Sequence, residues 1–164
     1  MKRSYCVFVI ALIFINVREI KSNEVMKGIT SSFFKVLDEC KRELSLTDNV
    51  LTDLYYFWKQ DHPLMHRDTG CAIVCMSQKL NLLDTIGKLH HGNAQEFAVN
   101  HGAGEQMAKK LVTMVHECEQ QFMEQEDACL RALDVAKCFR TAMHDVNWAP
   151  KFDVIVTEVL TEVK

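Results

Sequence analysis

Apolar residues recur every three or four positions through most of the chain, which is the spacing of one buried helix face. The first such segment runs to about residue 42, and its stripe comprises Met26, Ile29, Phe33, Val36, Leu37, Cys40 and Leu44. Further segments with this period begin near residues 47, 68, 93, 105 and 127, and no alternating strand pattern separates them. The pattern therefore predicts an all-α fold of about six helices.

Capping and helix-breaking residues predict where these helices begin and end. Thr47 is a suitable N-cap for the second helix, which carries Phe57 and Trp58 on its buried side until His62-Pro63 interrupts it. A helix containing two cysteines follows over residues 68–80, and Asn93 is predicted to cap a short helix that runs to residue 99. Residues 105–121 and 127–145 form the two longest amphipathic segments of this region.

The N-terminal segment has the pattern of a secretory signal. Tyr5–Val17 is apolar and follows Lys2 and Arg3, and this stretch is shorter than the ~20 residues that span a bilayer. We predict a signal peptide over residues 1–22 and a single domain over residues 23–164, which is long enough for one hydrophobic core. No other apolar run is long enough for a spanning helix.

The C-terminal segment, residues 151–164, is amphipathic and lies beyond the last cysteine. Its apolar stripe comprises Phe152, Ile155, Val156, Val159, Leu160 and Val163, and its other face carries Asp153, Glu158 and Glu162. We predict a mobile tail that moves between environments as its carboxylates gain or lose charge. A last helix packed permanently on the body is the alternative.

Charge and composition exclude several classes of protein. The predicted signal carries four basic residues and one acidic residue, so the net charge changes from −3 for the whole chain to −6 without it. Such an acidic domain is a poor partner for nucleic acid, heparin or anionic membranes. The hydrophobic content of 48%, with two prolines and six glycines, also excludes a disordered chain.

Six cysteines remain after the signal, in the spacing C-x30-C-x3-C-x42-C-x10-C-x8-C. An even number in an exported chain predicts three disulfides, whereas zinc sites prefer closely spaced cysteines in two pairs. Cys71 and Cys75 share one helix face and are poorly placed to bond to each other. Excluding that pair leaves twelve of the fifteen possible pairings open.

Catalysis, a cofactor and a metal site have little support in the sequence. The seven histidines include His90, His91 and His116, but no zinc-hydrolase or deaminase motif surrounds them. Ser77 is outside any nucleophile-elbow motif, and a phospholipase-like Cys-Cys-x-x-His-Asp helix is missing. Methionine and phenylalanine on helical stripes usually form core, but they also suit a pocket for a flexible alkyl chain. The residues alone therefore leave two classes, a disulfide-bonded helical carrier and a secreted recognition module with a filled core.

A set of short motifs narrows these classes to one protein family. The cysteine spacing occurs together with Asp38-Glu-Cys-Lys, Phe57-Trp58-Lys, Gly70-Cys-Ala-Ile-Val-Cys-Met-Ser77, Leu89-His-His-Gly-Asn93 and Asn147-Trp-Ala-Pro150. In these features the chain resembles the insect odorant-binding proteins and, among them, the moth pheromone-binding proteins, over residues 23–164. The resemblance implies about six helices around an apolar cavity. It also implies the disulfides Cys40–Cys75, Cys71–Cys129 and Cys118–Cys138.

The resemblance also implies a ligand site. Phe33 and Phe139 match the two phenylalanines that sandwich the ligand chain, and Ser77 matches the serine that hydrogen-bonds its oxygen. Other lining positions are matched by Phe57, Trp58, Ile73, Phe97 and Val115. The histidines His90, His91 and His116 match those that close the mouth, and Arg131 falls near it. Long-chain alcohols, aldehydes and acetates are the implied ligands.

The implied function is that of a soluble carrier in the sensillar lymph of the antenna. Such a carrier binds a pheromone or odorant, takes it to olfactory receptors and releases it when acid pH drives the tail into the cavity. Transient contact with a membrane or receptor and a homodimer are further expectations. The alternatives are a general odorant-binding protein for plant volatiles, a recognition module without a cavity, and an enzyme that acts on lipid esters.

Overall fold

The computed structural model describes the backbone of residues 2–151 and the side chains of residues 22–151. Within this part the chain forms six α-helices: α1 Lys2–Leu44, α2 Asp48–Tyr55, α3 Arg67–Lys79, α4 His91–Asn100, α5 Glu105–Gln121 and α6 Ala128–Asp145. Over these same residues, the only β-type pairing is one isolated bridge between Leu83 and Leu89. The all-α prediction is confirmed. The predicted tail helix, with Asp153, Glu158 and Glu162, lies outside the described residues.

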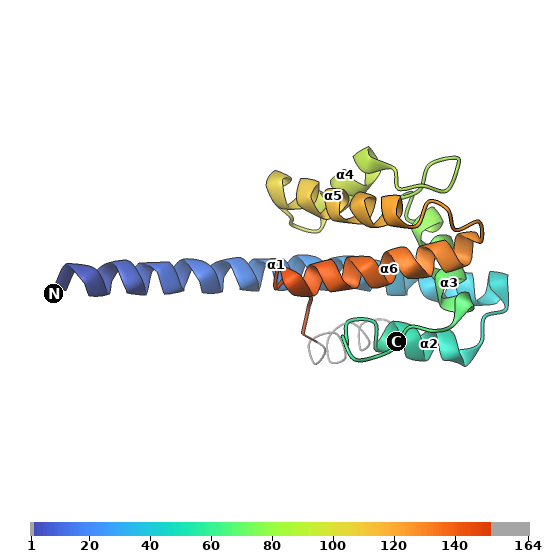
Figure 1. Ribbon diagram of the computed structural model, residues 1–164, viewed down its shortest axis with the longest axis horizontal. Coiled ribbons are helices and arrows are strands. Elements are labelled where there is room, and N and C mark those ends of the chain that lie inside the picture. Colours follow the sequence, from blue (N-terminus) through green and yellow to red (C-terminus); the bar gives the residue numbers. More distant parts are fainter. Residues whose placement is uncertain (1, 152–164) are drawn as a thin grey trace.

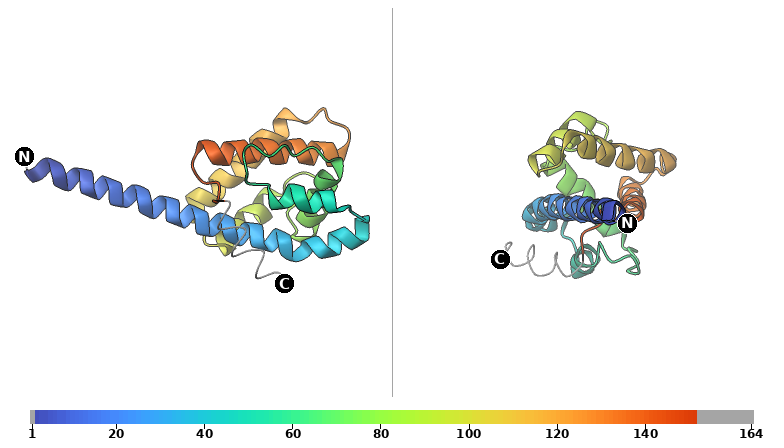
Figure 2. Two further views of the ribbon diagram at one scale, coloured as in Figure 1. Left: turned by 90° about the horizontal axis from the view of Figure 1, so that it is seen from below. Right: turned by 90° about the vertical axis from the view of Figure 1, so that its left-hand side faces the viewer.

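The first half of α1 projects away from the other helices, and its second half joins them (Figure 1). In the orientation of Figure 1, α4 and α5 lie above the level of α1 and α6, and α2 lies below it; Figure 2 shows the same order from the end. Helix α3 contacts both α1 and α6, while α5 contacts α4 and α6. Over the described residues, no helix combines the length and the apolar character that a membrane span requires.

Three disulfides join these helices, with the pairing that the resemblance implied. Cys40–Cys75 links α1 to α3 with Cα atoms 5.9 Å apart, and Cys118–Cys138 links α5 to α6 at 5.7 Å. Cys71–Cys129 joins the N-terminal halves of α3 and α6 with Cα atoms 4.5 Å apart. Helix α3 is therefore bonded to two different partners, as the i, i+4 spacing of its cysteines indicated.

The second helix ends earlier than the apolar pattern indicated. Helix α2 stops at Tyr55, so Phe57 and Trp58 lie in the turn that follows it and not on its buried face. The turn is closed locally by hydrogen bonds such as Phe57 N to Leu54 O at 3.2 Å. The Phe57 carbonyl, which a longer helix would use internally, instead accepts a hydrogen bond from Arg140 on α6. The Arg140 side chain therefore takes the place of the backbone N–H that would donate to this carbonyl in a longer helix.

The predicted cap of the short fourth helix was wrong. Helix α4 begins at His91, and the ring nitrogen Nδ1 of His90 accepts the backbone N–H of Asn93 at 3.2 Å. The Asn93 side chain instead donates to the carbonyl of Asn81 at 2.9 Å. An imidazole nitrogen can satisfy an unpaired first-turn N–H in the same way as the oxygen of a usual capping residue. The preference for asparagine at helix N-caps therefore predicted Asn93, whereas His90 is the N-cap.

Candidate functional site

A cavity of about 750 Å³ lies inside the helical shell. Side chains from all six helices, from the turn after α2 and from the loop between α3 and α4 line it, and they are predominantly apolar. The walls draw on both buried clusters of the core, represented by Met26 and Leu111 in one and by Leu37 and Met76 in the other. This volume is within the range of small-molecule sites in proteins, about 300–1,000 Å³.

All eight side chains that the sequence nominated for ligand contact line this cavity: Phe33, Phe57, Trp58, Ile73, Ser77, Phe97, Val115 and Phe139. Six of them lie on α1, α3, α4, α5 and α6, because each of these helices turns one stripe inward, and Phe57 and Trp58 lie in the turn after α2. Edge-to-face ring pairs connect them: Phe33 with Phe97 at 6.3 Å between centroids, and Trp58 with Phe139 at 6.4 Å. Their contact with a ligand remains a prediction.

Two hydrogen bonds hold Trp58 against α1. Its indole Nε1 donates to Thr30 Oγ1 at 3.1 Å, and the Thr30 hydroxyl donates to the Met26 carbonyl at 2.7 Å. Thr30 also lines the cavity, and sequence reasoning missed it. A signal was present, since Thr30 lies one turn before the apolar positions Phe33 and Phe34 and one turn after Met26.

The histidines that were nominated together are divided by the structure. His91 Nε2 lies 3.2 Å from His116 Nδ1, and both side chains line the cavity. His90 caps α4 and is absent from the cavity wall. One imidazole of the His91–His116 pair must donate and the other must accept, so this bond exists only while at least one ring is neutral.

The mouth of the cavity is identified by lining side chains that are also exposed to solvent. Ile86 is 70% exposed and Met123 is 49% exposed, and both line the cavity. Glu119 joins this region by accepting the Leu89 N–H at 2.9 Å, and Arg131 donates to the Gln125 carbonyl at 2.8 Å. Arg131 was expected here. Glu119 was missed, because its role depends on a loop amide that only the folded chain brings to α5.

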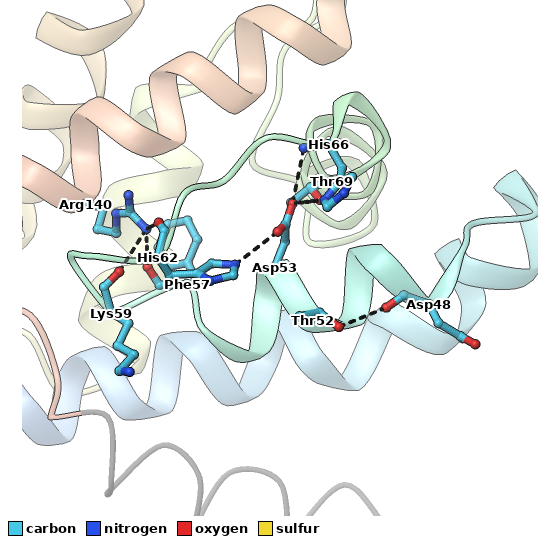
Figure 3. A network of polar contacts seen from close by, with 9 residues as sticks. All are labelled: Asp48, Thr52, Asp53, Phe57, Lys59, His62, His66, Thr69 and Arg140. Carbon is cyan, nitrogen blue, oxygen red and sulfur yellow. Dashed lines mark hydrogen bonds and ion pairs between the residues drawn. The ribbon is translucent and has the colours of Figure 1, made fainter.

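A polar network outside the cavity supports the turn that carries Phe57 and Trp58 (Figure 3). The Asp53 carboxylate, 1% exposed, accepts hydrogen bonds from Thr69 at 2.7 Å, from His66 Nδ1 at 2.9 Å and from His62 Nε2 at 3.2 Å. Burial alone raises the pKa of Asp53, but these donors outweigh burial and hold it below its ordinary value of 3.8. The network therefore keeps a buried charge at neutral pH.

Arg140 enters the same region from α6 and is 8% exposed. Burial lowers the pKa of its guanidinium from the ordinary value, while the nearby Asp53 charge acts to raise it. Neither Asp53 nor Arg140 was nominated from the sequence. Their side chains meet the turn only after α2, α3 and α6 have packed, so the local pattern carries no signal for them.

The donors available in the described part of the chain do not assemble a metal centre. Its six cysteines, Cys40, Cys71, Cys75, Cys118, Cys129 and Cys138, are all consumed by the disulfides. No group of three or more histidine, cysteine or carboxylate side chains in residues 22–151 is placed to hold a metal ion.

Comparisons with known proteins agree with this architecture. Residues 22–142 match the model of the PBP/GOBP family. The chain is 46% identical over 142 residues to pheromone-binding protein 2 of Epiphyas postvittana, covering 87% of this chain and 86% of that protein. It is 37% identical over 138 residues to general odorant-binding protein 1 of Heliothis virescens, covering 84% of each.

A solved structure extends the likeness to three dimensions. The crystal structure of Epiphyas postvittana pheromone binding protein 3 superposes with a TM-score of 0.65 at 56% identity, covering 70% of this chain and 98% of that one. The family match spans well over half of the sequence, and the relatives share its length. The chain therefore belongs to the PBP/GOBP family.

Proposed function

We propose that this protein is an extracellular carrier that binds one long-chain hydrophobic odorant or pheromone in its internal cavity and has no enzymatic activity. The observation that carries this proposal is the apolar cavity of about 750 Å³. A recognition module with a filled core would lack such a space. The names of the relatives, pheromone-binding and general odorant-binding proteins, support the same class of ligand.

The cavity suits a ligand whose affinity comes mainly from its alkyl chain. Burying about 12 methylenes at ~0.8 kcal/mol each contributes roughly 10 kcal/mol. The lost freedom of the ligand removes several kcal/mol of that, which leaves a dissociation constant near micromolar or lower. One hydrogen bond from Ser77 to an alcohol, aldehyde or acetate oxygen adds about 1 kcal/mol. Chain length therefore dominates affinity, and the end group adjusts it.

We propose that the protein is secreted into sensillar lymph after removal of residues 1–22. Three disulfides favour an oxidising compartment. The predicted signal coincides with the half of α1 that projects away from the cavity-bearing helices (Figure 1). Mass spectrometry of the protein secreted from insect cells tests the secretion and the cleavage site, since the expected mature chain begins at residue 23.

We propose that acid pH releases the ligand through two changes. Protonating both His91 and His116 removes the only acceptor in their contact and places two positive charges side by side at the cavity wall. Protonating Asp153, Glu158 and Glu162 removes the desolvation cost of moving the apolar stripe of residues 152–163 into the cavity. Together these changes loosen the wall and supply a competitor for the ligand.

A competition series at pH 7 and pH 5 tests this function. The fluorescent probe N-phenyl-1-naphthylamine is displaced by straight-chain alcohols, aldehydes and acetates of increasing length. We expect each added methylene to lower the dissociation constant about fourfold until the cavity is full. Failure of the full-length protein to bind either the probe or any of these chains at pH 7 would refute the carrier function.

Truncation after Pro150 separates the two parts of the acid mechanism. The truncated protein is expected to retain its ligand at pH 5, whereas the full chain releases it. Equal release by both proteins would contradict the role of the tail and leave the carrier function standing. A preference for short plant volatiles over long chains would favour the general odorant-binding alternative, which the 37% identical relative also supports.

A further inference from the structure

Two side chains of α6 form hydrogen bonds with backbone carbonyls of the turn that carries Phe57 and Trp58. Arg140 Nη1 donates to the carbonyls of Phe57 at 3.1 Å, Lys59 at 3.2 Å and His62 at 3.0 Å (Figure 3). One helical turn further along, His144 Nε2 lies 3.0 Å from the Trp58 carbonyl. A carbonyl can only accept, so this nitrogen of His144 carries a proton.

These contacts replace the hydrogen bonds that the turn does not make itself. Helix α2 has ended at Tyr55, and among the described residues the carbonyls of Phe57 and Trp58 find their donors on α6 and not in the turn. Part-buried carbonyls that lose their donors are costly, so removing Arg140 or His144 favours a shift of the turn toward water. Any such shift displaces two aromatic side chains of the cavity wall.

The geometry also connects two adjacent parts of the wall. Phe139, the neighbour of Arg140, lines the cavity with its ring 6.4 Å from that of Trp58. Of these two consecutive residues on α6, Phe139 supplies a side chain of the wall, and Arg140 holds the backbone of Phe57, which supplies another. The far end of the same segment is anchored by the Asp53 carboxylate through His62 and His66.

We propose that Arg140 and His144 are positioning residues of the ligand cavity, which hold the Phe57–Trp58 turn by its carbonyl oxygens and thereby set the shape of the aromatic wall. The predicted effect on ligand affinity rests on the proposed carrier function. The predicted effect on the position of Trp58 does not.

The contact pattern specifies what position 140 requires. All three carbonyls converge on the single atom Nη1, and Arg140 Nε has no hydrogen-bond partner among the described residues. A lysine ammonium also concentrates its N–H donors, three of them, on one atom. The lysine side chain is only about one bond shorter than that of arginine, so this atom can still lie near the three carbonyls. Lysine should therefore preserve the function of the site, whereas methionine retains the apolar stem and removes every donor.

The first test measures affinity for N-phenyl-1-naphthylamine at pH 7 and at a temperature where circular dichroism shows each variant fully folded. Arg140→Met is expected to weaken binding at least fivefold, and Arg140→Lys is expected to remain within twofold of the wild type. Lys137→Met, on the same helix, removes only a partly exposed ion pair with Asp134 and should not change binding. Asp127→Ala removes the N-cap of α6 and controls for lost stability away from the turn.

The second test reports on the wall without a ligand. In a Trp148→Phe background Trp58 is the only tryptophan, so its emission maximum and near-ultraviolet circular dichroism describe its surroundings. Arg140→Met and His144→Phe should each change both signals, whereas Arg140→Lys, Lys137→Met and Asp127→Ala should not. If the wild type binds no probe, the carrier function fails and this second test still decides the positioning role.

Unchanged probe affinity together with an unchanged Trp58 signal in folded Arg140→Met would overturn the proposal. If that variant does not fold, His144→Phe decides in its place, because it loses only the single contact with the Trp58 carbonyl. Unchanged signals in that variant would overturn the proposal equally. Loss of binding in Asp127→Ala to the same extent as in Arg140→Met would also overturn it, since the effect would then not be specific to the contacts with the turn.

Discussion

The hydroxyl of Thr69 donates a hydrogen bond to the carboxylate of Asp53, with Oγ1 and Oδ2 2.7 Å apart, and both side chains are buried (Figure 3). Thr69→Val preserves the shape of the side chain and removes this donor. Because a hydrogen bond to a charged group contributes about 1.5–3 kcal/mol, we expect the free energy of unfolding in urea to fall by about 2 kcal/mol.

Thr52 provides the matched control for that substitution. Its exposed hydroxyl makes only a local contact of 3.4 Å to the Asp48 carbonyl one turn earlier on α2. Thr52→Val should therefore change the unfolding free energy by less than about 0.5 kcal/mol. If both substitutions lowered the unfolding free energy equally, the hydrogen bond from Thr69 to the buried Asp53 carboxylate would contribute no more than an exposed local contact.

Stability should fall at strongly acid pH because of Asp53. The donors around this carboxylate hold its pKa below 3.8 in the folded protein, so the unfolded chain takes up a proton first as pH falls. The stabilisation is therefore present above the unfolded pKa and is lost as pH falls from there through the folded pKa. Urea unfolding at intervals from pH 6 to pH 2 measures it.

Asp53→Asn isolates this effect from that of the other carboxylates. The variant should be less stable at pH 7, because the amide is a weaker acceptor for Thr69, His66 and His62. Its stability should also fall less steeply than that of the wild type below about pH 4. Parallel pH curves for the two proteins would contradict a lowered pKa of Asp53 in the folded protein.

Gly70 permits the close approach of α3 to α6. A Cβ atom built at this position would lie 1.8 Å from the carbonyl oxygen of Cys129, which is backbone and unable to turn away. Gly70→Ala should therefore destabilise the protein by about 1–3 kcal/mol or more and slow formation of the neighbouring Cys71–Cys129 bond. Urea unfolding and disulfide mapping during refolding measure these effects.

Gly92 is the control glycine, because it also lies in a helix but has open surroundings. A Cβ atom there would meet His90 Cε1 at 3.4 Å, an ordinary contact. Gly92→Ala should leave stability unchanged or raise it slightly, since alanine is the better helix former. If both alanine variants behaved alike, the tight contact at Gly70 would not be the cause.

Ser77 is expected to recognise the polar end of the ligand. It lines the cavity and is 9% exposed, so an oxygen placed beside it would be largely shielded from water. Ser77→Ala should weaken binding of hexadecan-1-ol about fivefold, which corresponds to about 1 kcal/mol for one hydrogen bond. Binding of N-phenyl-1-naphthylamine should change less than twofold. An unchanged affinity for the alcohol would assign end-group recognition to another side chain.

Removing each disulfide in turn should reveal an order that follows loop length. The bonds close loops with sequence separations of 20, 35 and 58 residues. Constraint of the unfolded chain then predicts losses from about 3 kcal/mol for Cys118–Cys138 to about 4 kcal/mol for Cys71–Cys129. Urea unfolding of paired serine variants measures the series. The reverse order would show that native contacts, and not chain entropy, determine the effect.

Helices and inward-facing residues were accessible from the sequence because both follow from local periodicity. Phe33, Phe97 and Phe139 lie on stripes that repeat with the helical period, and each stripe must be buried wherever its helix packs. Cysteine number and spacing likewise predicted three disulfides. The residues alone left twelve pairings open, and only the resemblance selected the one observed.

Tertiary structure decided how the stripes meet and what supports them. Arg140 donates to the carbonyls of Phe57 and His62 across sequence separations of 83 and 78 residues. These contacts stabilise the turn that follows the end of α2 at Tyr55. Periodicity describes only neighbours within a few turns, whereas these contacts depend on the packing of several helices at once. The sequence by itself determined that the chain forms amphipathic helices joined by disulfides. The size of the cavity depends on how these helices pack, and the support of its aromatic wall comes from long-range hydrogen bonds that no local pattern encodes.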